Sequence, residues 1–127
     1  MKTDIPQTVY LKDYTPPAFL IDTVDLDFVI ETGSTTVTAT LAIRRNPAVA
    51  AQPLVLDGDE LETLSVAVDG QKVPISATPT SLTLNDLPDA FTLRTIVRIQ
   101  PDKNTRLSGL YRSKDGYFTQ CEAQGFR

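Results

Sequence analysis

The sequence predicts an all-β protein built as an antiparallel β-sandwich, and three observations indicate this class. Thr, Val and Ile make up more than a quarter of the 127 residues, and β-branched residues favour strands over helices. Apolar and polar residues alternate with a period of two in several segments. Gly, Pro, Asn or Asp interrupts the chain about every ten residues, and no segment has a convincing helical period. We therefore expect seven or eight strands.

The clearest alternation lies in the first third of the chain. Apolar residues between Val24 and Ile30 alternate with mostly polar neighbours, which predicts a half-buried strand that starts near Phe19. A second alternating run extends from Thr36 to Arg44, and the short loop at Gly33-Ser34 precedes it. Two such runs around a short Gly-containing loop predict a β-hairpin.

The middle of the chain predicts shorter strands. Asp69-Gly70 is a strong turn signal, because both residues tolerate a positive φ. Pro74 weakens the strand that follows and predicts that it lies at a sheet edge. The further strands are expected at Pro53–Leu56, Leu64–Val68, Lys72–Ile75, Leu82–Leu84 and Phe91–Ile99.

The chain reads as one domain over residues 1–127 with a distinct segment at each end. Residues 1–18 are polar and contain prolines, which indicates an extended arm. Residues 107–127 predict a hairpin around Asp115-Gly116, with Gln120 and Glu122 on one strand face about 7 Å apart. Because this segment is rich in aromatic and polar side chains up to the last residue, we expect the chain to be a piece of a longer polypeptide.

Composition excludes several classes of function. The chain has no His, so residues 1–127 cannot form a Ser-His-Asp triad or a His-ligated zinc site. A net charge of −4 disfavours nucleic acid as a partner. The N-terminus has no signal-peptide core and no apolar run is long enough for a bilayer, so we expect no membrane partner. The single cysteine, Cys121, fits a reducing compartment, and we expect a cytoplasmic protein.

Four polar features are interpreted as structural rather than catalytic. The acidic turn Asp57–Glu60 does not match a calcium-loop spacing and is interpreted as a solvated turn. Asp25 and Asp27 belong to the polar side of an alternating strand. Arg94 and Arg98 favour cross-strand ion pairs, and Cys121 lacks a His partner that would activate it as a nucleophile, so the interpretation is a buried thiol. The sequence therefore predicts neither a catalytic residue nor a metal ligand in this chain.

The segment Thr119–Arg127, preceded by Gly109–Ser113, resembles the end of the N-terminal domain of the bacterial aminopeptidase N family. These enzymes are zinc-dependent gluzincin aminopeptidases. The resemblance covers nearly the whole chain, and its other motifs are Asp13-Tyr14 with Pro16-Pro17, Val24–Phe28, Leu56–Leu61 and Asn85–Leu93.

The resemblance implies a saddle-shaped β-sandwich that packs on a separate catalytic domain of the same polypeptide. That domain, absent from this chain, would carry the His-Glu-x-x-His motif and one zinc ion, whereas residues 1–127 would hold no cofactor. By motif position, Glu122 matches the family glutamate that binds the free α-ammonium group of the peptide substrate. Gln120 matches the glutamine that lines the pocket for the first side chain.

Two other functions remain as alternatives. One is a freestanding β-sandwich module for protein interaction or carbohydrate binding, although the chain has no Trp to form a sugar-stacking platform. The other is an oxygen-ligated metal-binding domain, which would depend on the acidic turns alone.

Overall fold

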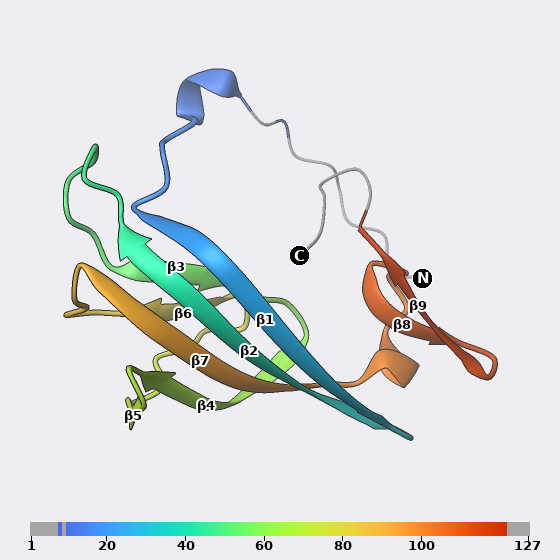
Figure 1. Ribbon diagram of the computed structural model, residues 1–127. Coiled ribbons are helices and arrows are strands. Elements are labelled where there is room, and N and C mark those ends of the chain that lie inside the picture. The colour runs from blue at the N-terminus through green and yellow to red at the C-terminus, as the bar shows by residue number, and fades with distance from the viewer. Residues whose placement is uncertain (1–7, 9, 122–127) are drawn as a thin grey trace.

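The computed structural model describes residues 8 and 10–121 and confirms an antiparallel all-β fold (Figure 1). Two short 3-10 helices, η1 (Leu11–Asp13) and η2 (Pro101–Lys103), are the helical elements of this part of the chain. The strands are β1 (Phe19–Glu31), β2 (Ser34–Arg45), β3 (Leu54–Asp57), β4 (Leu61–Val68), β5 (Gln71–Lys72), β6 (Ser81–Leu84), β7 (Ala90–Ile99), β8 (Gly109–Ser113) and β9 (Gly116–Gln120).

Five strands form one large sheet in the order β1-β2-β7-β4-β5. The predicted first hairpin is present, and β1 pairs with β2 from Phe19 opposite Arg45 to Glu31 opposite Ser34. A register shift between Ile21 and Thr23 is the irregularity in this ladder. The long strand β7 inserts between β2 and β4, so the strand that contributes two buried core residues, Phe91 and Leu93, lies at the centre of the sheet.

The second layer of the sandwich is a two-stranded sheet formed by β3 and β6. These strands cross behind β2 and β7 in Figure 1. Their inward side chains complete a core with the large sheet, and the members of this core are Phe19, Ile43, Leu54, Val66, Leu82, Leu84, Phe91 and Leu93. The rings of Phe19 and Phe91 pack edge to face, with centroids 6.0 Å apart. Because β3 and β6 are only four residues long, they cover part of the large sheet and leave the rest open.

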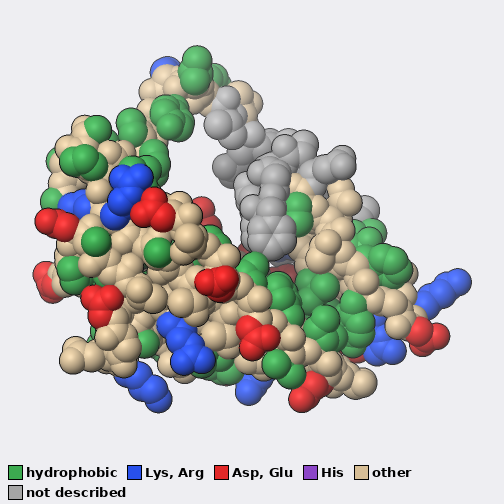
Figure 2. All heavy atoms as spheres, in the orientation of Figure 1, with side chains coloured by type: hydrophobic (Ala, Val, Ile, Leu, Met, Phe, Trp, Pro, Cys, Tyr) green, Lys and Arg blue, Asp and Glu red, His purple; other side chains and the backbone are tan. Residues whose placement is uncertain are grey.

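The opposite face of the large sheet is polar. Figure 2 shows side chains of both charge signs spread over this face. Arg98 pairs with Glu62 at 3.3 Å, as the cross-strand interpretation predicts, and Arg44 pairs with Asp22 at 3.1 Å. All these side chains are substantially exposed, so each pair contributes less than about 1 kcal/mol. This face is the hydrophilic exterior of the sandwich.

Three details of the sequence prediction are wrong. The strand β1 is not half-buried, because only Phe19 is buried and the other residues are exposed or intermediate. The strand after Asp69-Gly70 stops at Lys72 instead of Ile75. The last hairpin turns at Lys114-Asp115, one residue earlier than predicted, because Lys114 adopts the positive φ and Gly116 already pairs with Ser113. The register of the final strand is therefore set by the turn, not by the glycine.

Residues 10–17 precede β1 and are exposed. The side chains of Tyr10, Leu11 and Tyr14 are exposed around η1. The chain meets the body where the Asn46 amide donates a hydrogen bond to the Pro17 carbonyl at 2.9 Å and the Asn46 backbone N–H donates to Ala18. No helix in residues 8 and 10–121 is long and apolar enough to cross a membrane.

Candidate functional site

The candidate site is the hairpin of β8 and β9, which stands beside one end of the large sheet (Figure 1). Gln120 is the last residue of β9 and its side chain is exposed. It lies opposite Gly109, which has no side chain and adopts a φ of +72°. An added Cβ at Gly109 would have no described heavy atom within 4 Å. Among the described residues, Gln120 is thus an exposed side chain opposite a glycine.

An aromatic pair continues the same face of the hairpin. Tyr111 lies opposite Phe118, and their rings stack with centroids 5.9 Å apart. Side chains two residues apart on a strand share a face, so Gln120 lies next to Phe118 on the aromatic side. This arrangement places one amide beside an apolar ring. Such a surface suits a site that contacts both the polar backbone and an apolar side chain of a ligand.

Asn104 fixes the start of the hairpin. Its side-chain amide donates to the carbonyls of Ser108 at 2.8 Å and Leu110 at 2.9 Å. Its side-chain oxygen accepts from the Arg106 backbone N–H at 3.1 Å. These three bonds stabilise a sharp loop in which Leu107 has a φ of 57°, outside the usual range for a non-glycine residue. One side chain thus organises the loop that precedes β8.

An ion pair fastens the hairpin to η2. The guanidinium of Arg112 donates to Asp102 at 2.9 Å, and both side chains are roughly 30% or less exposed. The hydrogen bond that Asp102 accepts from Arg112 and the negative charge of Asp102 raise the pKa of Arg112 above its ordinary value. The guanidinium also lies 5.8 Å from the ring centroid of Tyr117. The η2 segment is itself anchored, because Pro101 is buried.

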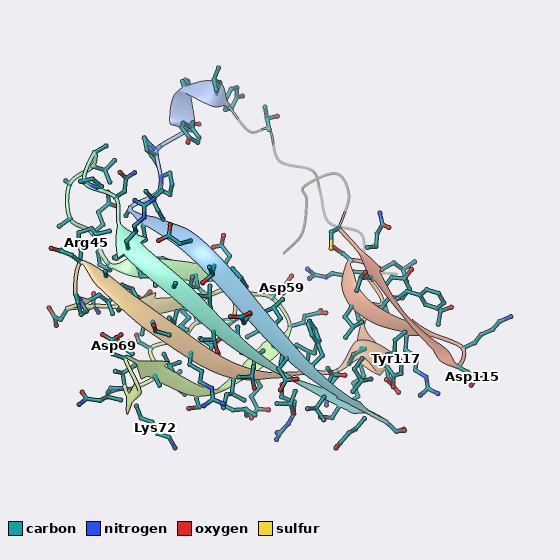
Figure 3. All side chains as sticks on the ribbon, in the orientation of Figure 1. Arg45, Asp59, Asp69, Lys72, Asp115 and Tyr117 are labelled. Atoms are coloured by element: carbon teal, nitrogen blue, oxygen red, sulfur yellow. The ribbon has the colours of Figure 1, made fainter. Side chains whose placement is uncertain are left out.

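A second ion-pair group connects the loop before β8 to the sandwich. Arg106 pairs with Asp59 and lies 3.8 Å from a carboxylate oxygen of Glu60. The turn Asp57–Glu60 therefore supplies partners for an arginine, as well as meeting solvent. Figure 3 labels Asp59 on the sandwich and Tyr117 and Asp115 on the hairpin. The acidic turn is thus joined directly to the loop that leads into the hairpin.

Sequence reasoning located the hairpin but missed the residues that hold it. Asn104, Asp102 and Arg106 were not predicted, although an Asn whose side chain bonds the backbone two residues later is a known turn signal. Glu122, the predicted α-ammonium ligand, lies outside the described residues. Cys121 is a free thiol of intermediate exposure. The structure thus describes one of the two predicted site residues, Gln120.

The described residues do not fit a metal ion. No group of three or more Cys, Asp or Glu side chains lies close enough to ligate one between residues 10 and 121, and the whole sequence has no His. A cavity of about 240 Å³ lies between the two sheets and is lined mainly by apolar side chains, such as those of Leu56, Leu82 and Val97. Its lining includes no residue of the hairpin.

The chain is similar in sequence to three curated bacterial proteins named aminopeptidase N. The protein of Caulobacter vibrioides is 44% identical over 132 residues, which is 100% of this chain and 15% of that protein. The Escherichia coli protein is 41% identical and the Haemophilus influenzae protein is 37% identical, over 98% and 93% of this chain. The chain aligns with the N-terminal part of these relatives and spans 14–15% of their length.

Solved structures show the same fold. An aminopeptidase A of Legionella pneumophila, solved with aspartic acid, matches 91% of this chain and 14% of its own with a TM-score of 0.80 and 24% identity. An M1 zinc metallopeptidase of Deinococcus radiodurans matches 85% of this chain and 27% of its own with a TM-score of 0.65 and 18% identity. No family model matches the sequence.

Proposed function

Residues 1–127 correspond to the N-terminal part of bacterial aminopeptidase N, and we propose on this basis that they form the substrate-recognition part of a zinc-dependent aminopeptidase. Such an enzyme removes single amino acids from the N-terminus of peptides. The observation that carries the proposal is the 44% identity over 100% of this chain. The partners of this part are then the catalytic domain of the same polypeptide and the N-terminus of a peptide.

Glu122 is assigned to the free α-ammonium group of the substrate. A carboxylate at a fixed position favours a substrate that begins with a cation and disfavours an internal peptide bond, which has no charge there. A charge-assisted hydrogen bond of this kind contributes roughly 1.5–3 kcal/mol. Gln120 is assigned to the pocket for the first side chain. Its exposure at the end of β9, beside Phe118, supports this role.

The anchoring of the hairpin also supports a recognition role. A site that measures the distance from an α-ammonium group to the cleaved bond must be held rigidly. Asn104 holds the loop before β8, and the Arg112–Asp102 pair holds β8 to η2. In this proposal the chain supplies neither metal ligands nor a proton-transfer group, since Glu122 only anchors the substrate and the catalytic domain performs the chemistry. The single free thiol, Cys121, supports a cytoplasmic location.

The isolated chain tests whether catalysis lies elsewhere. Purified residues 1–127 should not hydrolyse amino-acid anilides, with or without added zinc, because they have no histidine to ligate the metal. The measurement is release of the chromogenic aniline, with the full-length parent as the positive control. Turnover that copurifies with the isolated chain would contradict the proposal.

The full-length parent tests the assigned recognition residue. Glu122→Gln should lower kcat/KM for substrates with a free α-amino group roughly 10- to 100-fold, since it removes one charge-assisted hydrogen bond. Zinc content, measured by atomic emission, should not change. Glu62→Gln, which alters an exposed carboxylate on the large sheet, is the matched control and should leave kcat/KM unchanged. Normal kinetics in Glu122→Gln would remove this residue from the site.

A further inference from the structure

We propose that the free edge of β1 is a docking site for an extended polypeptide strand from outside residues 1–127, in which apolar residues alternate with Lys or Arg. The strand would join the large sheet beside β1 as a sixth strand. This inference is independent of the proposed function, because it depends on the edge, exposure and charge of β1 alone.

The backbone of β1 offers a long unpaired edge. The strand is 13 residues long, and its hydrogen-bonded neighbour within residues 10–121 is β2. Figure 1 shows β1 at the border of the large sheet. Proteins usually protect such an edge with a short strand, a proline, charged side chains such as lysine, or a bulge. Phe19–Glu31 contains no Pro or Lys, its charged residues are all acidic, so that a basic strand would neutralise them, and its one register shift lies near the start, between Ile21 and Thr23.

The opposite edge of the same sheet is protected against pairing with another strand. The edge strand β5 has two residues, Gln71 and Lys72, and the chain reaches Pro74 two positions later. A strand this short, with a lysine and a nearby proline, cannot accept a long partner. The two edges of the large sheet therefore differ, since the β5 edge is protected and the β1 edge is open.

One face of β1 is apolar but uncovered. The side chains of Val24, Leu26, Phe28 and Ile30 are 52%, 39%, 42% and 46% exposed. Leu93 of β7 lies in the same cross-strand row as Val24 and is 0% exposed, because the small sheet covers the centre of the large sheet. The apolar residues of β1 therefore lie on the core face of the large sheet, beyond the part that β3 and β6 cover. A sixth strand with apolar residues on this side would cover it.

The other face of β1 is acidic. Asp25, Asp27 and Glu31 alternate with the apolar residues and are exposed. None of these three carboxylates forms an ion pair with another residue in the described part of the chain. Arg94 lies in the same row as Asp25, but Thr40 of β2 separates them. Lys or Arg on an added strand would lie directly opposite these carboxylates, where opposite charges stabilise strand pairing.

The same charges disfavour a second copy of this chain as the occupant. In an antiparallel pair of β1 strands centred on Leu26, Asp25 of one copy would lie opposite Asp27 of the other. Like charges directly opposite each other destabilise a sheet. Charge complementarity therefore selects a basic strand, and pairing between copies is the competing outcome in the test.

The test titrates isotope-labelled residues 1–127 with a synthetic peptide of about ten residues that alternates Val with Lys, a length typical of strands. Amide chemical shifts should change along β1 and not along β4, and binding should weaken as salt is added. Methylating the peptide nitrogens that face β1 should abolish binding, whereas methylating those that face away should not. A peptide that alternates Val with Glu should not bind.

Two variants separate the charges of β1 from net charge. Asp25→Asn with Asp27→Asn should weaken binding about fivefold or more at low salt, because two cross-strand ion pairs are lost. Asp13→Asn with Asp86→Asn makes the same change in net charge at exposed sites away from β1, and should alter binding less than about twofold. The proposal is overturned by absent shifts on β1, by binding that tolerates both methylated peptides, or by a dimer formed through β1 itself at pH 7.

Discussion

At the scale of single residues, polar side chains fix the backbone at points where the strands end. Asp69 is a clear case, because it adopts a φ of 50° just after β4. Its carboxylate accepts a hydrogen bond from the Thr92 backbone N–H at 2.8 Å, and its own N–H donates to the Thr92 carbonyl at 2.9 Å. Asp tolerates this left-handed conformation better than most residues. The turn, and the register of β4 beside β7, thus depend on one side chain.

We predict that Asp69→Ala lowers the free energy of unfolding by about 2 kcal/mol. The change removes a hydrogen bond and places a residue with a Cβ and no compensating polar group at a positive φ. Asp69→Asn is the matched control and should cost only about 0.5 kcal/mol, since Asn tolerates the same φ and retains an acceptor oxygen. Urea unfolding measures both. Equal losses in the two variants would show that the side-chain acceptor is not what stabilises this turn.

At the scale of elements, sequence patterns identified strands better than they identified burial. The alternation correctly placed β1, β2 and β7, and Asp69-Gly70 correctly marked a turn. The same alternation wrongly predicted that Val24 to Ile30 would be half-buried. Alternation indicates which residues share a face of the sheet. How much of that face is buried depends on the length of the strands that cover it, and β3 and β6 are short.

The hairpin that carries Gln120 shows the same limit for the candidate site. Its aromatic and turn residues are adjacent in sequence, so a hairpin was predictable from the local pattern. Its attachments are not local, because Arg106 reaches Asp59 across 47 positions of sequence. No spacing rule in the sequence identifies such a pair. Asn104 acts within six residues, and an Asx-type turn is the signal that would have revealed it.

We predict that Asn104→Ala loosens the hairpin while leaving the large sheet intact. Ala removes both side-chain donors and the acceptor that hold the loop before β8. Losing such bonds, at about 1 kcal/mol or more in total, should speed amide hydrogen exchange in β8 and β9 roughly tenfold or more. Exchange in β2 and β7 should stay unchanged.

Asn85→Ala provides the control for this experiment. Asn85 is an exposed turn residue between β6 and β7, so its removal should not alter exchange in the hairpin. Exchange that speeds up equally in the hairpin and in β7 of the Asn104 variant would mean that the two parts unfold together. The slow amide exchange of the hairpin would then not depend on its attachment through Asn104.

At the scale of the whole molecule, charge opposes the association that the apolar surface favours. The chain carries a net charge of −4 at pH 7 and has a sequence pI of about 4.7. Exposed apolar side chains gather along β1, and others surround η1. Net charge keeps such molecules apart, and this protection is lost where the charge vanishes. Solution behaviour should therefore change sharply with pH.

We predict that residues 1–127 are monomeric at pH 7 and low salt and associate as the pH falls toward about 4.7. Near this pH the net charge of the chain vanishes and no longer keeps the molecules apart, while the apolar row Val24, Leu26, Phe28 and Ile30 stays exposed. Light scattering across this pH range measures the change in mass. Leu26→Lys should reduce the association because it interrupts the apolar row, even though the added positive charge brings the net charge closer to zero. Thr38→Lys makes the same change in net charge on the polar face and should not reduce association, whereas equal effects of the two variants would show that net charge alone controls association.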